Sequence, residues 1–194
     1  MGKDTKIEWS DHTFNPWHGC LKIDPACANC YAATFSKRIG QDIWGADKPR
    51  RFFGDKHWNE PLKWDFAASL AGERHRVFCA SMADVFEDRD DLFSHRERLW
   101  KMIELTPNLD WLLLTKRPEN IVSMIPENWR HTPLANVWYG TTVGDQGGVK
   151  RIEELINVPA HIRFLSCEPL LEPIDIGNIE DKIQWVICGG ESGA

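Results

Sequence analysis

The sequence predicts an α/β fold, a partial (β/α) barrel in which residues 1–194 form a single domain. Two observations predict it. Short apolar runs typical of buried strands alternate, from residue 77 to residue 188, with segments whose apolar residues recur at helical spacing. Such alternation is typical of βα units and a parallel sheet. About six or seven units exceed what a small open sheet holds, which favours a whole or partial barrel.

The expected elements can be placed in chain order. A strand within Thr13–Trp17 leads into a loop at 19–31, and Gly40 ends a helix over Tyr31–Ile39. Residues 41–64 lack a clear period but include a short strand near Arg51–Phe53. The later strands are Val77–Ser81, Trp111–Thr115, Val137–Thr142, Ile162–Ser166 and Trp185–Cys188. The later helices are Lys63–Leu70, Leu92–Leu105, Pro118–Ile125 and Val149–Ile156.

The end of the sequence follows the last strand without a further helix. A parallel strand is normally covered on both faces. We therefore expect that the barrel is truncated and that its C-terminal part is missing from this chain.

Composition excludes several classes of protein. The chain has 194 residues, 42% of them hydrophobic and 27% charged, which is enough for one domain with a core. The net charge of -6 argues against broad binding to nucleic-acid backbone, although a local basic patch would be compatible with it. No run of about 18 apolar residues is present, so we expect no membrane span. The N-terminal residues lack the apolar region of a secretion signal, which predicts a cytoplasmic protein with reduced thiols.

Three of the six cysteines lie on the loop at 19–31, as Cys20, Cys27 and Cys30, with the spacing C-x6-C-x2-C. Three thiolates on one loop indicate a metal centre rather than disulfides. A structural zinc site needs a fourth ligand, which His18 or His12 would supply. A [4Fe–4S] cluster bound by three thiolates instead leaves one iron open for a small molecule. On chemistry alone, zinc and the open cluster are about equally favoured.

Polar side chains follow the predicted strands, at the edge where a barrel carries its site. Five of them are candidates for binding a cofactor or substrate: Ser81, Asp84, Lys116, Thr141 and Glu168. A ligand with a carboxylate and a ribose would suit this set, because lysine pairs with carboxylates and acidic or hydroxyl groups bond sugar hydroxyls. Each of these residues could instead cap a helix or lie on a solvated turn.

Several motifs in order carry a resemblance to a known family. They are IEW at 7–9, GC-x6-C-x2-CY at 19–31, SMADVF at 81–86, LTKRP at 114–118, GTTV at 140–143, SCEPL at 166–170 and GGESG at 189–193. Over almost the whole chain, the sequence resembles phage-associated three-cysteine proteins of unassigned function, some of which occur beside a "three-Cys-motif partner" protein. Members of that family extend beyond the point where this chain ends.

That family is similar to a divergent branch of the radical S-adenosylmethionine (SAM) enzymes. The resemblance implies a partial (β/α) barrel of the radical SAM type, a [4Fe–4S] cluster on Cys20, Cys27 and Cys30, and cleavage of SAM to a 5′-deoxyadenosyl radical. This sequence departs from the usual pattern, which has three residues between the first two cysteines and an aromatic residue where Asn29 stands. The phage association implies a nucleic-acid or nucleotide substrate, or a three-Cys-motif partner protein.

Two other functions compete with the radical-SAM interpretation. The first is a zinc-stabilised barrel that binds nucleic acid or a protein and performs no chemistry. The second is a metal-dependent nuclease that uses Asp84, Glu168 and Glu191. Thiolates are the wrong ligands for the magnesium of a nuclease, which makes the second alternative weaker.

Overall fold

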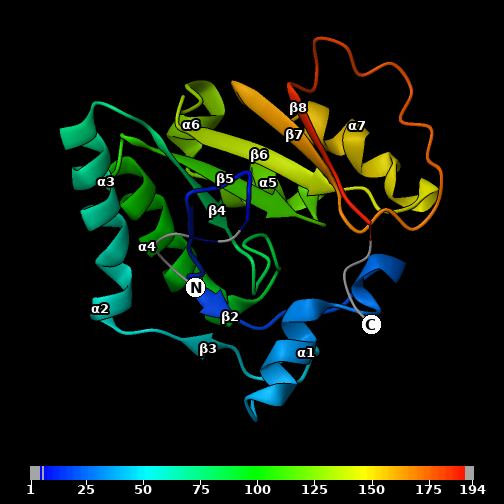
Figure 1. Cartoon of the computed structure of the whole chain (residues 1–194), viewed down its shortest axis with the longest axis horizontal. Helices are drawn as coiled ribbons and strands as arrows, with labels where there is room; N and C mark the ends of the chain where they lie inside the picture. The colour runs from blue at the N-terminus through cyan, green and yellow to red at the C-terminus, as the bar shows by residue number, and fades with distance from the viewer. Residues whose placement is uncertain (1–4, 6, 191–194) are drawn as a thin grey trace.

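The computed structural model describes residue 5 and residues 7–190. Its framework is a six-stranded, all-parallel sheet in the order β1-β4-β5-β6-β7-β8. The sheet curls into a half-barrel, with helices on its outer side (Figure 1). The predicted βα alternation is therefore confirmed at the level of a mixed α/β fold with a half-barrel of parallel strands.

The strands are β1 His12–Thr13, β4 His75–Cys79, β5 Leu109–Thr115, β6 Val137–Thr142, β7 Ile162–Cys167 and β8 Trp185–Cys188. Five of the predicted strands recur with small shifts at their ends. β5 is buried along almost its whole length, as expected for a strand covered on both faces. Neighbouring strands are in a continuous register, in which Thr115 lies beside Thr141 and Thr142 beside Ser166.

The longer helices are α1 Tyr31–Arg38, α3 Glu60–Ala71, α4 Phe93–Glu104 and α7 Lys150–Ile156. Shorter ones are α2 Asp55–Trp58, α5 Ile121–Met124 and α6 Glu127–His131. The 3-10 turns are η1 Pro25–Cys27, η2 Asp90–Leu92, η3 Pro118–Asn120 and η4 Gln146–Gly148. In α4 the residues at helical spacing, Leu99, Trp100 and Ile103, are buried, as the sequence predicts. None of the helices in the described residues is both long and apolar enough to cross a membrane.

The two faces of the sheet carry different apolar clusters. Side chains at alternate positions pack outward against the helices in one large core that includes Trp111, Leu113 and Tyr139. The other face carries a smaller cluster around Leu112, Phe164 and Ile187. The period of two along a strand explains this division, because successive side chains leave opposite faces.

Aromatic side chains from distant segments close part of the inner face. Trp9 comes from the N-terminal segment and lies 4.7 Å from Phe78 and 6.1 Å from Trp185, centroid to centroid. The Phe164 ring lies over Gly140, in the space that a Cβ atom there would occupy. Gly140 therefore allows the ring to pack flat against β6.

The predicted strand within Thr13–Trp17 is in fact two short strands. β1 joins the main sheet beside β4, whereas β2, Trp17–His18, pairs antiparallel with β3, Arg51–Phe52, in a separate small sheet. Pro16 lies between them and has no N–H to donate to a ladder, which is the physical reason for the break. The short strand expected near Arg51–Phe53 is therefore confirmed, with its partner in the chain just before the cysteine loop.

Candidate functional site

The cysteine loop begins at the carboxyl edge of the half-barrel. The Gly19 N–H donates to the Met82 carbonyl at 2.9 Å, and Gly19 forms an isolated bridge to Ala83. Gly19 has a φ of 111°, and a Cβ atom there would collide with the Ile43 carbonyl. Glycine is thus required at this position for the chain to leave β2 and run close to the 43–50 segment.

A second contact fixes the middle of the loop. The Asp24 carboxylate accepts a hydrogen bond from the Cys27 N–H at 3.2 Å and caps η1. The same carboxylate pairs with Arg151 of α7 at 2.7 Å, and both side chains are nearly buried. Arg151 in turn donates to the Thr142 carbonyl at 3.1 Å. The loop is therefore tied to the sheet edge through α7.

The three loop cysteines are free thiols of intermediate burial, and Cys30 immediately precedes α1. These thiols suit a centre bound by thiolates, because thiolate sulfur is a soft donor and the three side chains are not in disulfides, are partly accessible and lie close in sequence. In the described part of the chain, however, no three or more His, Cys, Asp or Glu side chains are grouped closely enough to hold a metal ion. The donors fit such a centre in type and location, and binding would require the loop to bring the thiols closer together.

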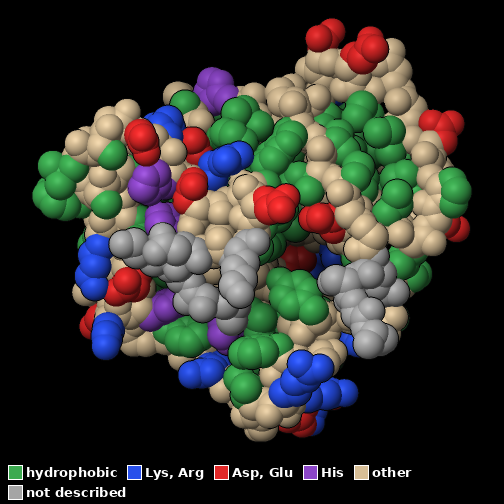
Figure 2. All heavy atoms as spheres, in the orientation of Figure 1, with side chains coloured by type: hydrophobic (Ala, Val, Ile, Leu, Met, Phe, Trp, Pro, Cys, Tyr) green, Lys and Arg blue, Asp and Glu red, His purple; other side chains and the backbone are tan. Residues whose placement is uncertain are grey.

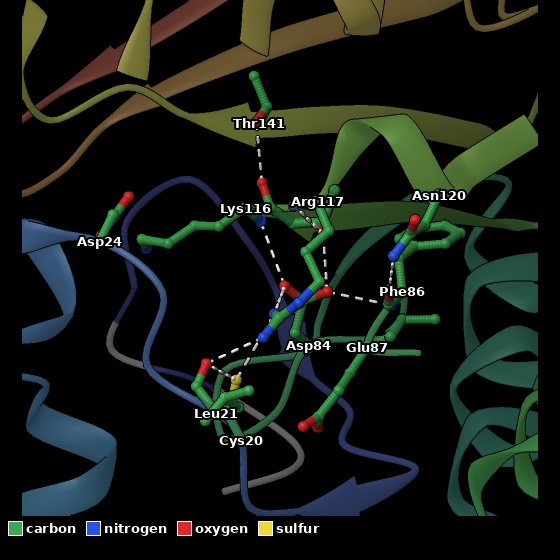
Figure 3. A network of polar contacts seen from close by, with 12 residues as sticks. Cys20, Leu21, Asp24, Asp84, Phe86, Glu87, Lys116, Arg117, Asn120 and Thr141 are labelled. Atoms are coloured by element: carbon green, nitrogen blue, oxygen red, sulfur yellow. Dashed lines mark hydrogen bonds and ion pairs between the residues drawn. The ribbon is translucent and has the colours of Figure 1, made fainter. Parts of the chain in front are cut away.

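Arg117 connects the cysteine loop to the sheet (Figure 3). Its guanidinium donates to the Leu21 carbonyl at 2.9 Å and to the Asp84 carboxylate at 2.7 Å. It also lies 3.9 Å from the Cys20 sulfur. Burial disfavours the charged form of Arg117, but Asp84 and Cys20 outweigh that effect and raise its pKa. A fixed cation therefore lies beside the first loop cysteine.

Asp84 is the anchor of this network. Besides Arg117, its carboxylate accepts hydrogen bonds from the Thr115 hydroxyl at 2.7 Å, from the Phe86 N–H at 3.0 Å and from the Lys116 N–H at 3.2 Å. Its side chain is only 7% exposed. The carboxylate is thus satisfied within the protein, and its role in this structure is to orient Arg117.

The Cys20 thiol lies in an environment that opposes ionisation. Burial and then the nearby Asp84 raise its pKa, Arg117 acts in the opposite direction, and the resulting pKa is about 12. A thiol must lose its proton to bind a metal. Arg117 is the group positioned to stabilise the resulting thiolate.

Lys116 and Glu168 are the candidate residues whose charges remain available. Both are half-buried, and within the described residues neither the Lys116 ammonium nor the Glu168 carboxylate has a hydrogen bond or ion pair. In Figure 3 the Lys116 side chain extends away from the Arg117 network. The Glu168 carboxylate lies over Gly189, where a Cβ atom would come within 2.5 Å of its Oε1. The absence of a side chain at Gly189 therefore makes room for Glu168.

The remaining two candidates contribute to the walls of the site. Thr141 is fully buried and donates to the Thr115 carbonyl at 2.9 Å. Ser81 accepts a hydrogen bond from Asn15 at its hydroxyl and one from the Tyr31 hydroxyl, 2.7 Å away, at its carbonyl. Tyr31 is 56% exposed as a whole residue, and desolvation together with the nearby Cys30 raises its pKa to about 12. Tyr31 thus links the start of α1 to the end of β4.

The histidines near the loop have different surroundings. His12 lies on β1 and its ring stacks on Trp64. Its Nε2 atom is 3.2 Å from Nδ1 of His75. His18 is buried, its ring packs edge-on against Phe53, and its Nδ1 has no hydrogen-bond partner in the described structure. Burial lowers the pKa of His18 to about 4, with a further contribution from Arg51, so the ring is neutral at pH 7. Glu191, the third carboxylate of the nuclease alternative, lies outside the described residues.

Charge is unevenly distributed around the site. The last turn of α1 carries Lys37 and Arg38, and Figure 2 shows basic side chains gathered over this helix. The whole chain nevertheless has a net charge of -6. The cysteine loop is therefore followed by a locally basic helix on an acidic protein.

The sequence indicated much of this edge of the sheet but not all of the contacts that form it. Arg117 stands beside Lys116 in the LTKRP segment, yet nothing in the sequence distinguishes the arginine that contacts the loop from the lysine, whose ammonium has no partner among the described residues. The pairing of Asp24 with Arg151 joins residues 127 positions apart and has no local signal. Only the fold could reveal it.

Comparison with known proteins gives one result. Neither the curated proteins nor the solved structures searched contain a match to this chain. A family model described as "Protein of unknown function (DUF5131)" matches residues 4–194, nearly the entire sequence. The chain therefore belongs to the DUF5131 family.

Proposed function

We propose that this protein is a radical-SAM-like enzyme that holds a [4Fe–4S] cluster through Cys20, Cys27 and Cys30. The observation that carries the proposal is the presence of three free, partly accessible thiols on one loop at the carboxyl edge of a parallel half-barrel. This is the edge where barrel enzymes place their sites. When bound, the cluster and SAM would supply one-electron chemistry that the side chains themselves lack.

The protein's own residues have separate roles in this proposal. Arg117 places a cation 3.9 Å from the Cys20 sulfur and favours its thiolate form. Lys116 pairs with the carboxylate of SAM, and Glu168 accepts hydrogen bonds from its ammonium or ribose hydroxyls. Ser81, Asp84 and Thr141 shape the site, Asp84 by orienting Arg117. The aromatic side chains that close part of the inner face exclude water from that part of the half-barrel.

For the substrate we infer a chemical class and not a particular compound. We infer a nucleic-acid or nucleotide substrate, or action together with a three-Cys-motif partner protein, in the cytoplasm. The basic last turn of α1, beside the cysteine loop, supports a polyanionic substrate, because Lys37 and Arg38 would attract phosphates despite the negative net charge.

The test is anaerobic reconstitution of the protein with iron and sulfide, followed by absorption spectroscopy and iron quantification, before and after SAM is added. We expect broad brown absorption, about four irons per chain and a spectral change with SAM. Cys27→Ala should lose most of the iron. Cys79→Ala is the matched control, because Cys79 is fully buried in β4 and outside the loop. Unchanged iron content in Cys27→Ala would refute the cluster assignment.

The SAM site is tested separately. Lys116→Gln and Glu168→Gln should each weaken SAM binding to the reconstituted protein by about tenfold or more, because each removes a charged contact. Iron content should stay unchanged, since neither side chain is a cluster ligand. Lys101→Gln, at an exposed position on α4, is the control. Equal SAM affinity in all three variants would show that SAM binds elsewhere.

A zinc site is the second candidate, and one observation favours it. The buried, neutral His18 has an Nδ1 atom without a partner in the described structure, which is the state that a zinc ligand needs. The protein would then be a zinc-stabilised module that binds nucleic acid or a protein. A colourless protein with one zinc, lost in His18→Ala, would favour this function over the cluster.

A further inference from the structure

Two cysteines outside the loop lie side by side on neighbouring strands. Cys167 ends β7, Cys188 ends β8, and the two residues are direct partners in the parallel register. Because the two residues are in register on parallel strands, their side chains leave the same face of the sheet. In-register positions on adjacent strands lie at a separation that a disulfide can bridge.

The backbone around the two residues holds them in this arrangement. The Gly189 N–H donates to the Cys167 carbonyl at 3.2 Å, and the Leu170 N–H donates to the Gly189 carbonyl at 2.9 Å. These bonds extend the β7–β8 ladder past the cysteines. The thiols are therefore held together by the sheet rather than by a flexible loop.

The two thiols differ in access to solvent. Cys167 is 2% exposed and packs in the outer core, whereas Cys188 is exposed. Burial, followed by the nearby Cys188, raises the pKa of Cys167 to about 11. A small oxidant would thus reach Cys188 first, and Cys167 would be the neighbouring thiol that resolves the oxidised Cys188.

We propose that Cys167 and Cys188 form a redox-active dithiol that closes to a disulfide when a hydroperoxide oxidises Cys188. The Cys188 sulfur attacks one oxygen of the peroxide, and the O–O bond breaks. That oxygen stays on Cys188 as a sulfenic acid, and the other oxygen leaves as an alcohol or water. The Cys167 sulfur then attacks the Cys188 sulfur, and the hydroxyl leaves with the remaining proton as water. Two thiols lose two electrons, and the peroxide gains them.

The dithiol adjoins the mouth of the half-barrel. Glu168 and Gly189 directly follow the two cysteines, and the Glu168 carboxylate lies against Gly189 on the opposite face of the sheet. A bond between Cys167 and Cys188 would fix the strand ends beneath Glu168. The proposal does not depend on a cluster or on SAM.

The experiment is peptide mapping of the full chain after treatment with hydrogen peroxide and alkylation of the remaining thiols without reduction. Trypsin separates the two cysteines, because Lys182 lies between them and each resulting peptide, 164–182 and 183–194, holds one cysteine. We expect these two peptides to appear as a cross-linked pair that dithiothreitol releases. The pair should persist in Cys79→Ser and be absent from Cys188→Ser. Recovery of both peptides alkylated after peroxide treatment would overturn the proposal.

A sulfenic-acid trap tests the order of attack. In Cys167→Ser the Cys188 sulfenic acid has no resolving thiol, so dimedone should label peptide 183–194 after peroxide treatment. In Cys188→Ser the buried Cys167 should remain unlabelled. Labelling of Cys167 in Cys188→Ser at the rate seen for Cys188 would refute the division of roles.

Discussion

Replacement of Asp84 by alanine is the substitution with the clearest expected consequence. Asp84 is the counter-ion of the buried Arg117 and the acceptor for the Thr115 hydroxyl and two backbone N–H groups. Its loss would leave a buried guanidinium without a counter-ion. It would also free the cation that contacts the Leu21 carbonyl and the Cys20 sulfur.

The size of the effect follows from the burial of the pair. The side chains of Arg117 and Asp84 are 8% and 7% exposed. Breaking a buried pair by removing one partner costs about 3–5 kcal/mol. A domain of this kind is stable by about 5–15 kcal/mol in total. Asp84→Ala should therefore remove a large fraction of the free energy of unfolding.

Urea unfolding monitored by tryptophan fluorescence measures this loss. With a slope of about 2–3 kcal/mol per molar urea, the midpoint should fall by about 1–2 M. Asp91→Ala is the control, because the Arg89–Asp91 pair is more exposed and should contribute about 0–1 kcal/mol. The double variant Asp84→Ala/Arg117→Met should be more stable than Asp84→Ala, because it removes the uncompensated charge. A loss below about 1 kcal/mol in Asp84→Ala would refute this account of the network.

Three further predictions concern other parts of the molecule. His18 has a pKa of about 4 in the folded protein, below its ordinary value of 6.5, so protonation favours unfolding and stability should fall as the pH drops from 6.5 toward 4. At pH 5 the loss should be about 2 kcal/mol relative to pH 7, and urea unfolding of His18→Gln should show less of it. Gly140→Ala should cost about 1–3 kcal/mol in the same assay, because the new methyl group would occupy the position of the Phe164 ring. Asp24→Ala should cost about 3 kcal/mol and make the cysteine loop more sensitive to proteolysis, because it removes both the η1 cap and the partner of Arg151.

Each of these predictions has a control or a contradicting result. Equal pH dependence in the wild type and His18→Gln would show that other groups cause the acid sensitivity. Gly54→Ala should be tolerated better than Gly140→Ala, since no atom lies within 4 Å of a Cβ placed at Gly54. An Asp24→Ala protein as stable and as protease-resistant as the wild type would show that the loop is held by other contacts.

The sequence determined those features that depend on local patterns. Apolar runs such as 111–115 were sufficient to place the central strands, because a strand buried on both faces needs little besides apolar side chains. Periodic apolar residues likewise placed α4. The cysteine spacing identified the loop, and the positions of Lys116 and Glu168 after strands placed them at the carboxyl edge of the sheet.

Only the tertiary structure decided how those polar groups are used. Lys116 and Arg117 are adjacent and chemically similar, yet Arg117 pairs with Asp84 and contacts the cysteine loop, while the Lys116 ammonium has no partner among the described residues. The pairing of β2 with β3 and of Asp24 with Arg151 was equally hidden. Hydrogen bonds and ion pairs depend on distances of about 3 Å between segments far apart in the chain. Local residue patterns do not specify those distances, so only the fold determines which charges are paired within the described residues and which are not.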